Sequence, residues 1–349
     1  MNLSSSQATE SRIINGQPAD VAVGDVTLTL TLSLTLTLTL SLSLSLSLSH
    51  SHSLSLSLSL TQDYPLVSIR QFENGEGSLC AGSVLRPNVV LTAAHCVSPE
   101  STDPNEPIGG GTPFNSINNY LIPVVITAAD VPFPDPDAVP ATEALVKTKA
   151  VVTSVDWNVT ESVLGGFDLA LLLLEEDLVG VEAVKLAAPG TTLAAGESLT
   201  VAGWGNISPV LGMFVRSPTL MEAQVESIPV QTCVDLYEAS YGSDGGQTQL
   251  REAQRVADED VWVCAQGALE NGAYTDICQG DSGGPLSIID GNGEATIVGI
   301  ASFTGIPCAA TDPPQPGVYT NVAKFSSWIE RWIGVWERMG HVAKQYKGA

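Results

Sequence analysis

The sequence is poor in basic residues, and this shortage excludes one class of partner. Its 349 residues include 14 lysines and arginines against 38 aspartates and glutamates, which gives a formal net charge of −24 at pH 7. Proteins that bind a phosphate backbone use basic surfaces to displace its counterions. We therefore expect no nucleic-acid partner. An acidic chain of this kind favours solubility and attracts cationic substrates.

Patterns of long helices are scarce as well. The 32 glycines and 21 prolines favour many turns and short strands. Short apolar runs broken by turn residues predict the strands of a mostly β protein, in barrels or sandwiches. The acidic, Pro- and Gly-rich stretches 98–114 and 130–142 indicate solvent-facing connections. The apolar runs occupy residues 89–91, 121–127, 169–174, 199–203, 296–302 and 318–321.

One helix is expected, near the C-terminal end. Apolar residues recur there at spacings of three and four, which places them on one face of a helix that packs against the sheet. They are Phe325, Trp328, Ile329, Trp332, Ile333, Trp336 and Met339.

The sequence contains no C-x-x-C pair, so it shows no zinc or thioredoxin-like redox motif. Its six cysteines are even in number, which favours disulfide bonds and an oxidising compartment. Residues 1–12 have no apolar core of a secretory signal peptide. We give the cysteines more weight and predict a secreted protein whose reading frame begins further upstream. Sequons at Asn158 and Asn206 would allow N-glycosylation on that route.

Residues 27–61 differ in composition from the rest of the chain. Every odd position is Ser or Thr, and every even position is Leu except His50 and His52. As a strand, this segment would be a long edge with its leucines on one face, and as a membrane span it would carry a hydroxyl on every second residue. A CT dinucleotide repeat also encodes alternating Leu and Ser. We favour this third interpretation, in which the segment is a translated CT repeat from a retained intron or a recent expansion. We therefore expect no metal site at the His-x-His pair.

Histidines are few, and this leaves essentially one candidate for a general base at neutral pH. Of the four, two lie in the repeat and His341 lies close to the C-terminus. His95 follows an apolar run directly and precedes Cys96. Taken alone, a histidine beside a cysteine is more often structural than catalytic.

A second motif supports the catalytic role of His95. In the octapeptide Cys-Gln-Gly-Asp-Ser-Gly-Gly-Pro at 278–285, glycines on both sides free the backbone to present Ser282 and to direct N–H groups into one cavity. The two motifs together resemble the trypsin-like serine proteases of the chymotrypsin fold. The resemblance extends over nearly the whole chain from Arg12 onward, with the repeat as an insertion.

The resemblance implies an all-β fold of two packed six-stranded antiparallel β-barrels followed by a C-terminal α-helix. Residues 1–12 would be the remnant of a propeptide, and 13–349 the peptidase domain. Within that domain we expect the first barrel to about residue 195, the second over about 196–322, and the helix over about 323–340.

By this resemblance Ser282 is the nucleophile, His95 takes its proton, and Asp168 orients the imidazole. A carboxylate within an apolar run is costly to bury unless it is paired, and the imidazole N–H supplies that partner. Ser302 would support Asp168. The backbone N–H groups of Gly280 and Ser282 would form the oxyanion hole.

The segment that begins with Arg12 and Ile13 resembles the activation site of the family. Cleavage after Arg12 would free an amino group at Ile13. That group would fold inward and pair with Asp281, because an unpaired buried carboxylate costs several kcal/mol. The sequence there is Ile-Ile-Asn-Gly, where the family usually has Ile-Val-Gly-Gly.

The resemblance also pairs the six cysteines. Each bond closes a short loop and contributes about 3 to 4 kcal/mol in the chain-entropy model. The first bond would clamp the loop of His95, and the third would clamp the loop of Ser282. The implied pairs are Cys80 with Cys96, Cys233 with Cys264, and Cys278 with Cys308.

In this family the floor of the primary specificity pocket stands six residues before the nucleophile, and here it is Asp276. A carboxylate there selects Arg or Lys, because no apolar side chain can form the ion pair. Gly317 keeps one wall open, whereas Thr304 replaces the usual Gly and could narrow the entrance. Ile277 removes a hydroxyl partner for Lys, so we expect Arg over Lys.

The sequence therefore predicts a secreted endopeptidase, activated by cleavage, that cuts proteins or peptides after Arg and less readily after Lys. It predicts a monomer with no metal or organic cofactor, open to control by protein protease inhibitors. The alternative is a noncatalytic homologue that binds another protein, which requires the repeat or Thr304 to spoil the site. A membrane-anchored protease is disfavoured, because the leucine-rich segment begins only fourteen residues after Ile13, the end that must be buried.

Overall fold

In the computed structural model of the chain, the residues fall into two units, Met1–Ala19 with Tyr64–Ala349, and Asp20–Asp63. The expected activation segment, both acidic connections, His50, His52 and the sequon at Asn158 lie outside the described residues. In the second unit the described strands are β2 (Leu46–Leu48) and β3 (Leu54–Leu56), which pair antiparallel. The structure describes residues 17–18, 46–48, 54–56, 65–73, 76–97, 124–127, 145–157, 162–178, 181–208, 214–215, 217, 220–241, 259–268, 274–309 and 315–343.

Six antiparallel strands close the first barrel. Two of them, β6 and β9, pair along the run from Val89 opposite Leu173 to Thr92 opposite Ala170, and all their residues are buried. Continuous apolar runs are expected of strands that are covered on both faces. Around the barrel the order is β4 (Leu66–Glu73), β5 (Glu76–Arg86), β6 (Val89–Thr92), β9 (Ala170–Leu174), β8 (Leu145–Thr153) and β7 (Val124–Thr127).

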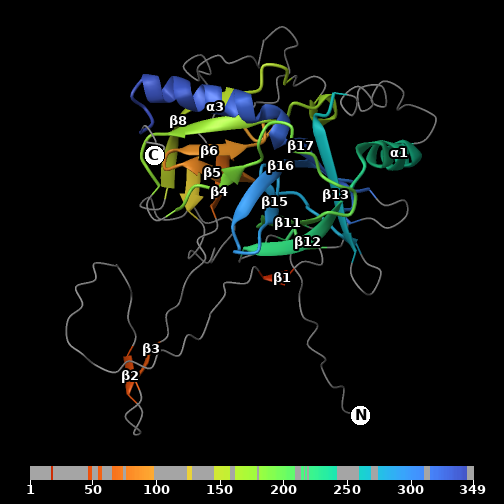
Figure 1. Cartoon of the computed structure of the whole chain (residues 1–349), viewed down its shortest axis with the longest axis horizontal. Helices are drawn as coiled ribbons and strands as arrows, with labels where there is room; N and C mark the ends of the chain where they lie inside the picture. Colours follow the sequence, from red (N-terminus) through yellow and green to blue (C-terminus); the bar gives the residue numbers. More distant parts are fainter. Residues whose placement is uncertain are drawn as a thin grey trace. The chain divides into compact units, whose positions relative to one another are not determined.

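The second barrel is also a ring of six antiparallel strands, closed where β12 pairs with β13. In β12 the residues Met221, Ala223 and Val225 are buried and alternate with more exposed ones. The predicted fold of two six-stranded antiparallel barrels is therefore confirmed (Figure 1). The ring runs β12 (Met221–Ile228), β11 (Ser198–Gly203), β15 (Pro285–Ile289), β16 (Ala295–Phe303), β17 (Gly317–Asn321) and β13 (Trp262–Ala268), and the short strands β1 (Gln17–Pro18), β14 (Tyr274–Thr275) and β10 (Lys185–Leu186) add to it.

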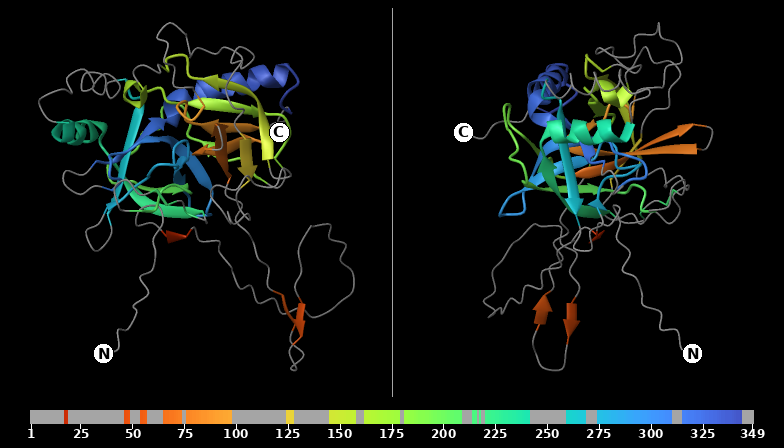
Figure 2. Two further views of the ribbon diagram at one scale, coloured as in Figure 1. Left: turned by 180° about the vertical axis from the view of Figure 1, so that it is seen from behind. Right: turned by 90° about the vertical axis from the view of Figure 1, so that its right-hand side faces the viewer.

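The C-terminal helix α3 (Val322–Arg338) begins directly after β17. Asn321 caps it, and its side-chain oxygen accepts the N–H of Ala323 at 3.0 Å. Figures 1 and 2 show α3 lying along the first barrel, where Arg86 lies 3.6 Å from Glu330. The predicted apolar face is buried or half-buried, with one exception. Met339 is 62% exposed because the helix ends at the residue before it, so its inclusion in that face was wrong.

Two helical elements were not expected from the sequence. The helix α1 (Val230–Tyr241) buries Cys233, Val234 and Tyr237, and the turn η3 (Ser162–Gly165) is a short 3-10 helix. Within the described ranges, no helix has both the length and the apolar character needed to cross a membrane.

We predict that residues 27–61 are dispensable for folding. They belong to the unit Asp20–Asp63, whereas both barrels belong to the other unit. Deletion removes 35 of the 44 residues of that unit. Because loop closure costs about 0.6 kcal/mol per doubling of loop length, the deletion should stabilise the barrels by about 1.4 kcal/mol. It should also reduce association through the alternating, uncharged leucine edge.

Thermal unfolding and light scattering check this prediction. The matched control replaces 27–61 with a Gly/Ser linker of equal length, which keeps the loop but removes the leucines. We expect both variants to unfold cooperatively and to scatter less light than the wild type. Loss of folding in both variants would show that the repeat is a structural element.

Candidate active site

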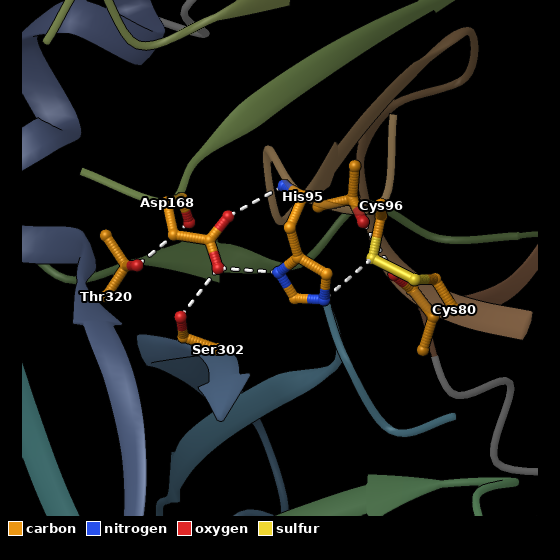
Figure 3. Close-up of polar contacts among 8 residues, drawn as sticks. Cys80, His95, Cys96, Asp168, Ser302 and Thr320 are labelled. Carbon is orange, nitrogen blue, oxygen red and sulfur yellow. Dashed lines mark hydrogen bonds and ion pairs between the residues drawn. A yellow bond between two sulfur atoms is a disulfide. The ribbon is translucent and has the colours of Figure 1, made fainter. Parts of the chain in front are cut away.

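His95 and Asp168 come from neighbouring strands of the first barrel. His95 follows β6, Asp168 precedes β9, and these two strands pair. His95 Nδ1 lies 2.7 Å from Asp168 Oδ2, and the backbone N–H of His95 donates to Oδ1 at 2.8 Å (Figure 3). Because a carboxylate only accepts hydrogen bonds, the neutral imidazole carries its hydrogen on Nδ1 and leaves Nε2 as the basic nitrogen.

The second barrel completes the hydrogen bonding of Asp168, which is fully buried. Ser302 Oγ donates to Asp168 Oδ2 at 2.6 Å, and Thr320 Oγ1 donates to the backbone oxygen of Asp168 at 2.8 Å (Figure 3). Burial acts to raise the pKa of Asp168, but the charge and hydrogen bonds of His95 and the bond from Ser302 hold it below its usual value. Burial acts to lower the pKa of His95, but the charge of Asp168 and the bond to it hold that pKa above 6.5.

The backbone before Asp168 has an unusual conformation. Gly166 has φ 74° and Phe167 has φ 58°, a region that residues with a side chain rarely adopt. The ring of Phe167 is buried and packs edge-on against Phe325 of α3, with centroids 5.9 Å apart. This packing supports the conformation that presents Asp168 to His95.

Ser282 is half-buried in a turn that contacts both barrels. The N–H of Ala81 donates to the Ser282 backbone oxygen at 2.7 Å, and the N–H of Gly283 donates to the oxygen of Ala301 at 2.8 Å. Gly283 has φ 79°, and a Cβ there would lie 2.3 Å from the backbone oxygen of Ala81. Only glycine therefore fits beside the serine at this position.

The imidazole of His95 is not hydrogen-bonded to Ser282 in the described part of the chain. Its Nε2 lies 3.8 Å from Cys96 Sγ (Figure 3). A catalytic hydrogen bond such as the one expected between Ser282 and His95 is often long before substrate binds and tightens in the complex.

Cys80, His95 and Cys96 have their possible ligand atoms within 4.8 Å of one another, but the disulfide between the two cysteines leaves no thiolate for a metal ion. The other disulfides join Cys233 with Cys264 and Cys278 with Cys308, as the resemblance implies.

Asp281 is a buried carboxylate with no salt bridge among the described residues. It accepts the N–H of Gly205 at 2.8 Å and the N–H of Cys278 at 2.9 Å. A Cβ at Gly203 or Gly205 would lie 2.1 or 2.5 Å from carboxylate atoms, so glycines are needed there. Burial raises the pKa of Asp281 from 3.8 to about 6 despite these hydrogen bonds. Its expected partner, the amino group of Ile13, lies outside the described residues.

Asp276, the expected floor of the specificity pocket, is fully buried. Its Oδ1 accepts the N–H of Ile277 at 2.8 Å, and the hydroxyl of Thr304 donates to Oδ2. Burial raises the pKa of Asp276 from 3.8 to about 8, and the charge of Asp281 adds to this. A Cβ at Gly317 would lie 2.6 Å from Oδ1. The hydroxyl of Thr304 therefore contacts the carboxylate of Asp276 directly.

Comparison with known proteins gives consistent matches. The family model described as Trypsin matches residues 60–114 and 125–329. The chain is 30% identical to human Kallikrein-8 over 262 residues, which cover 74% of this chain and 79% of that protein. It is 29% identical to Chymotrypsin-like elastase family member 1 of Rattus norvegicus over 259 residues, which cover 73% and 78%. It is 35% identical to CLIP domain-containing serine protease C9 of Anopheles gambiae over 171 residues, which cover 48% and 44%.

Proposed function

The chain belongs to the trypsin family of serine proteases, and we propose that it is an endopeptidase that cleaves after Arg and less readily after Lys. The observation that carries the catalytic part of this proposal is the buried network in which Asp168 accepts hydrogen bonds from both His95 and Ser302. The preference for Arg rests on the buried carboxylate of Asp276, six residues before Ser282. A buried carboxylate that orients an imidazole fixes its tautomer and stabilises the imidazolium, which favours general-base catalysis by histidine. We also propose a secreted monomer that acts on protein substrates and is controlled by protein protease inhibitors.

In the proposed reaction, His95 Nε2 accepts the hydroxyl proton of Ser282 while its Oγ attacks the carbonyl carbon of the substrate. The ionised Asp168 stabilises the imidazolium that forms. Backbone N–H groups of Gly280 and Ser282 donate to the oxyanion, and each such donor contributes about 10² to 10³ in rate. His95 then gives the proton to the leaving amine, and water repeats the sequence on the acyl-enzyme.

The rival function is protein binding by a noncatalytic homologue. The observation that favours it is the hydrogen bond from the Thr304 hydroxyl to Asp276. Asp276 is fully buried, and this hydroxyl already takes up one oxygen of the carboxylate that a substrate cation would contact. Burst kinetics separate the two functions. The chain that begins at Ile13 is mixed with an Arg ester whose leaving group is chromophoric. A burst of about one equivalent supports the protease, and the absence of acylation supports the binding module.

Asp276→Ser is predicted to lower kcat/KM for Arg substrates by about 10²- to 10⁴-fold, because breaking a buried ion pair costs about 3 to 5 kcal/mol. Substrates with Phe or Leu at the cleaved bond make no ion pair, so their kcat/KM should change far less. Steady-state kinetics on matched Arg, Lys, Phe and Leu amides measure both effects.

The matched control for this variant is Asp156→Ser, which makes the same change of charge on an exposed turn. It should keep the wild-type preference. A wild-type enzyme that already prefers Leu or Phe would show that Thr304 overrides Asp276, and the Arg specificity would then be wrong.

A further inference from the structure

Asn206 is a polar residue whose hydrogen-bonding groups face the protein. It lies in the loop after β11 and is only 7% exposed. Its Oδ1 accepts the N–H of Ser208 at 3.0 Å and the N–H of Val215 at 2.8 Å. The sequence marks Asn206 as a sequon, but a buried and doubly bonded side chain in the folded protein indicates an internal role.

The backbone of Asn206 is bonded to the peptide that carries a proposed oxyanion donor. The N–H of Asn206 donates to the carbonyl oxygen of Gln279 at 2.7 Å. The peptide bond between Gln279 and Gly280 is trans, so its carbonyl and the N–H of Gly280 point in opposite directions. The bond from Asn206 therefore fixes the direction of the Gly280 N–H.

The Gln279–Gly280 peptide needs a restraint from outside its own turn, because its second residue is glycine. Gly280 has φ 100°, a region that glycine enters without steric cost, and glycine reaches other regions as readily. The Gln279–Gly280 peptide can therefore turn over at low conformational cost. Turning it would break the 2.7 Å bond to Asn206 and point the Gly280 N–H away from the oxyanion.

The side chain of Asn206 in turn holds its own backbone in place. The N–H of Ile207 donates to the oxygen of Val215 at 2.8 Å, and the N–H of Val215 returns a bond to Asn206 Oδ1. Phe214 and Val215 are 49% and 42% exposed, so apolar burial contributes little here. These polar bonds restrain the position of the Asn206 N–H, and Asn206 Nδ2 also donates to Gln279 Oε1 at 3.5 Å.

We propose that Asn206 is a positioning residue for the oxyanion hole, acting through the Gln279 carbonyl on the N–H of Gly280. The inference rests on the proposed protease function and adds a residue that the Ser-His-Asp motif does not include. The adjacent N–H of Gly205 binds the carboxylate of Asp281 at 2.8 Å. Two successive N–H groups of one loop thus hold both Asp281 and the oxyanion peptide.

The test compares Asn206→Ala and Asn206→Ser on an Arg p-nitroanilide. Losing an oxyanion donor outright costs about 10² to 10³ in rate, so a partly misdirected donor should lower kcat by about 10- to 100-fold with KM nearly unchanged. Alanine removes both bonds to Oδ1 and the 3.5 Å bond from Nδ2 to Gln279 Oε1. Serine can reach only one of the two N–H groups, so its loss should be smaller.

Two inhibitors separate positioning from general structure. An Arg boronate forms a tetrahedral adduct that uses the oxyanion donors, and it should bind more weakly by the same factor as kcat falls. Benzamidine fills only the specificity pocket and should bind as tightly as in the wild type. Asn206→Asp keeps the acceptor oxygen but loses the Nδ2 donor to Gln279 Oε1, so it should recover part of the lost kcat. Asn292→Ala, on an exposed turn, is the matched control for an Asn-to-Ala change.

The outcomes are distinct. A wild-type chain that hydrolyses no Arg substrate would overturn the proposed function itself. An active wild type with unchanged kcat and boronate affinity in Asn206→Ala would overturn the positioning role. Parallel loss of benzamidine binding in both the Ala and Ser variants would make Asn206 a general structural residue and would equally overturn it.

Discussion

Ser282→Ala is expected to remove almost all turnover of an Arg p-nitroanilide, leaving a residual rate of about 10³ to 10⁴ over the uncatalysed reaction. The substitution removes the attacking oxygen. It leaves the backbone bonds of the turn to Ala81 and Ala301, so the N–H donors keep their places. His95→Ala should have a similar effect. The double variant should be no slower than either single variant, because the two residues act as a unit.

Steady-state kinetics check this result, and benzamidine affinity reports whether the specificity pocket is intact in each variant. Ser198→Ala, at an exposed position of β11, is the matched control and should keep the wild-type rate. Equal turnover by the wild type and Ser282→Ala would remove the protease assignment.

The pH dependence of the wild type tests the base role of His95 in the same assay. His95 must be neutral to accept a proton, and its pKa is held above 6.5 by Asp168. Activity should therefore rise as the pH increases through that raised value. The stability that the charged pair contributes has the opposite sign, since it is full below pH 6.5 and is lost as the pH rises through the raised pKa.

Much of the candidate site was predictable because its signals are local in the sequence. Each of the two motifs is contained within a few residues. One has glycines around Ser282, and in the other His95 directly precedes Cys96 in the sequence. Strands such as β6 and β9 are continuous apolar runs and were equally clear. The helix α1 was missed because its buried face amounts to little more than one turn. The alternation in β12 was a usable signal for a strand that was overlooked.

Contacts between residues far apart in the chain were not predictable. Phe167 has a positive φ and packs against Phe325, more than 150 residues further along the chain, and no local pattern records that contact. Thr304 was expected near the pocket entrance, but its hydroxyl bond to Asp276 depends on how two loops approach each other. Asn206 even carried a misleading local signal, because a sequon suggests an exposed side chain.

Cleavage after Arg12 is expected to convert an inactive chain into an active protease, and Arg12→Gln is expected to block that conversion. The physical reason lies at Asp281, which is held by two backbone N–H groups. The rise of its pKa from 3.8 to about 6 corresponds to about 3 kcal/mol against the buried charge. The new amino group at Ile13 would recover that free energy by pairing with Asp281 and would stabilise the adjacent Ser282 turn.

Hydrolysis of an Arg p-nitroanilide before and after treatment with an Arg- and Lys-specific protease measures the conversion. N-terminal sequencing confirms the cut. Arg12→Lys is the matched control, because it keeps a cleavable basic residue and should still be activated. Full activity of the uncut Arg12→Gln chain would contradict the activation mechanism.

The loss of activity of the cleaved chain at high pH tests which group is the partner of Asp281. An α-amino group has an ordinary pKa of about 8, and pairing with a carboxylate raises it. Its contribution to the active conformation is therefore full below about pH 8 and is lost as the pH rises through the raised value. Acetylating the new amino group at Ile13 removes the charge at every pH, so the acetylated chain should stay inactive. An acetylated chain that keeps its activity would show that Asp281 needs no cation from Ile13.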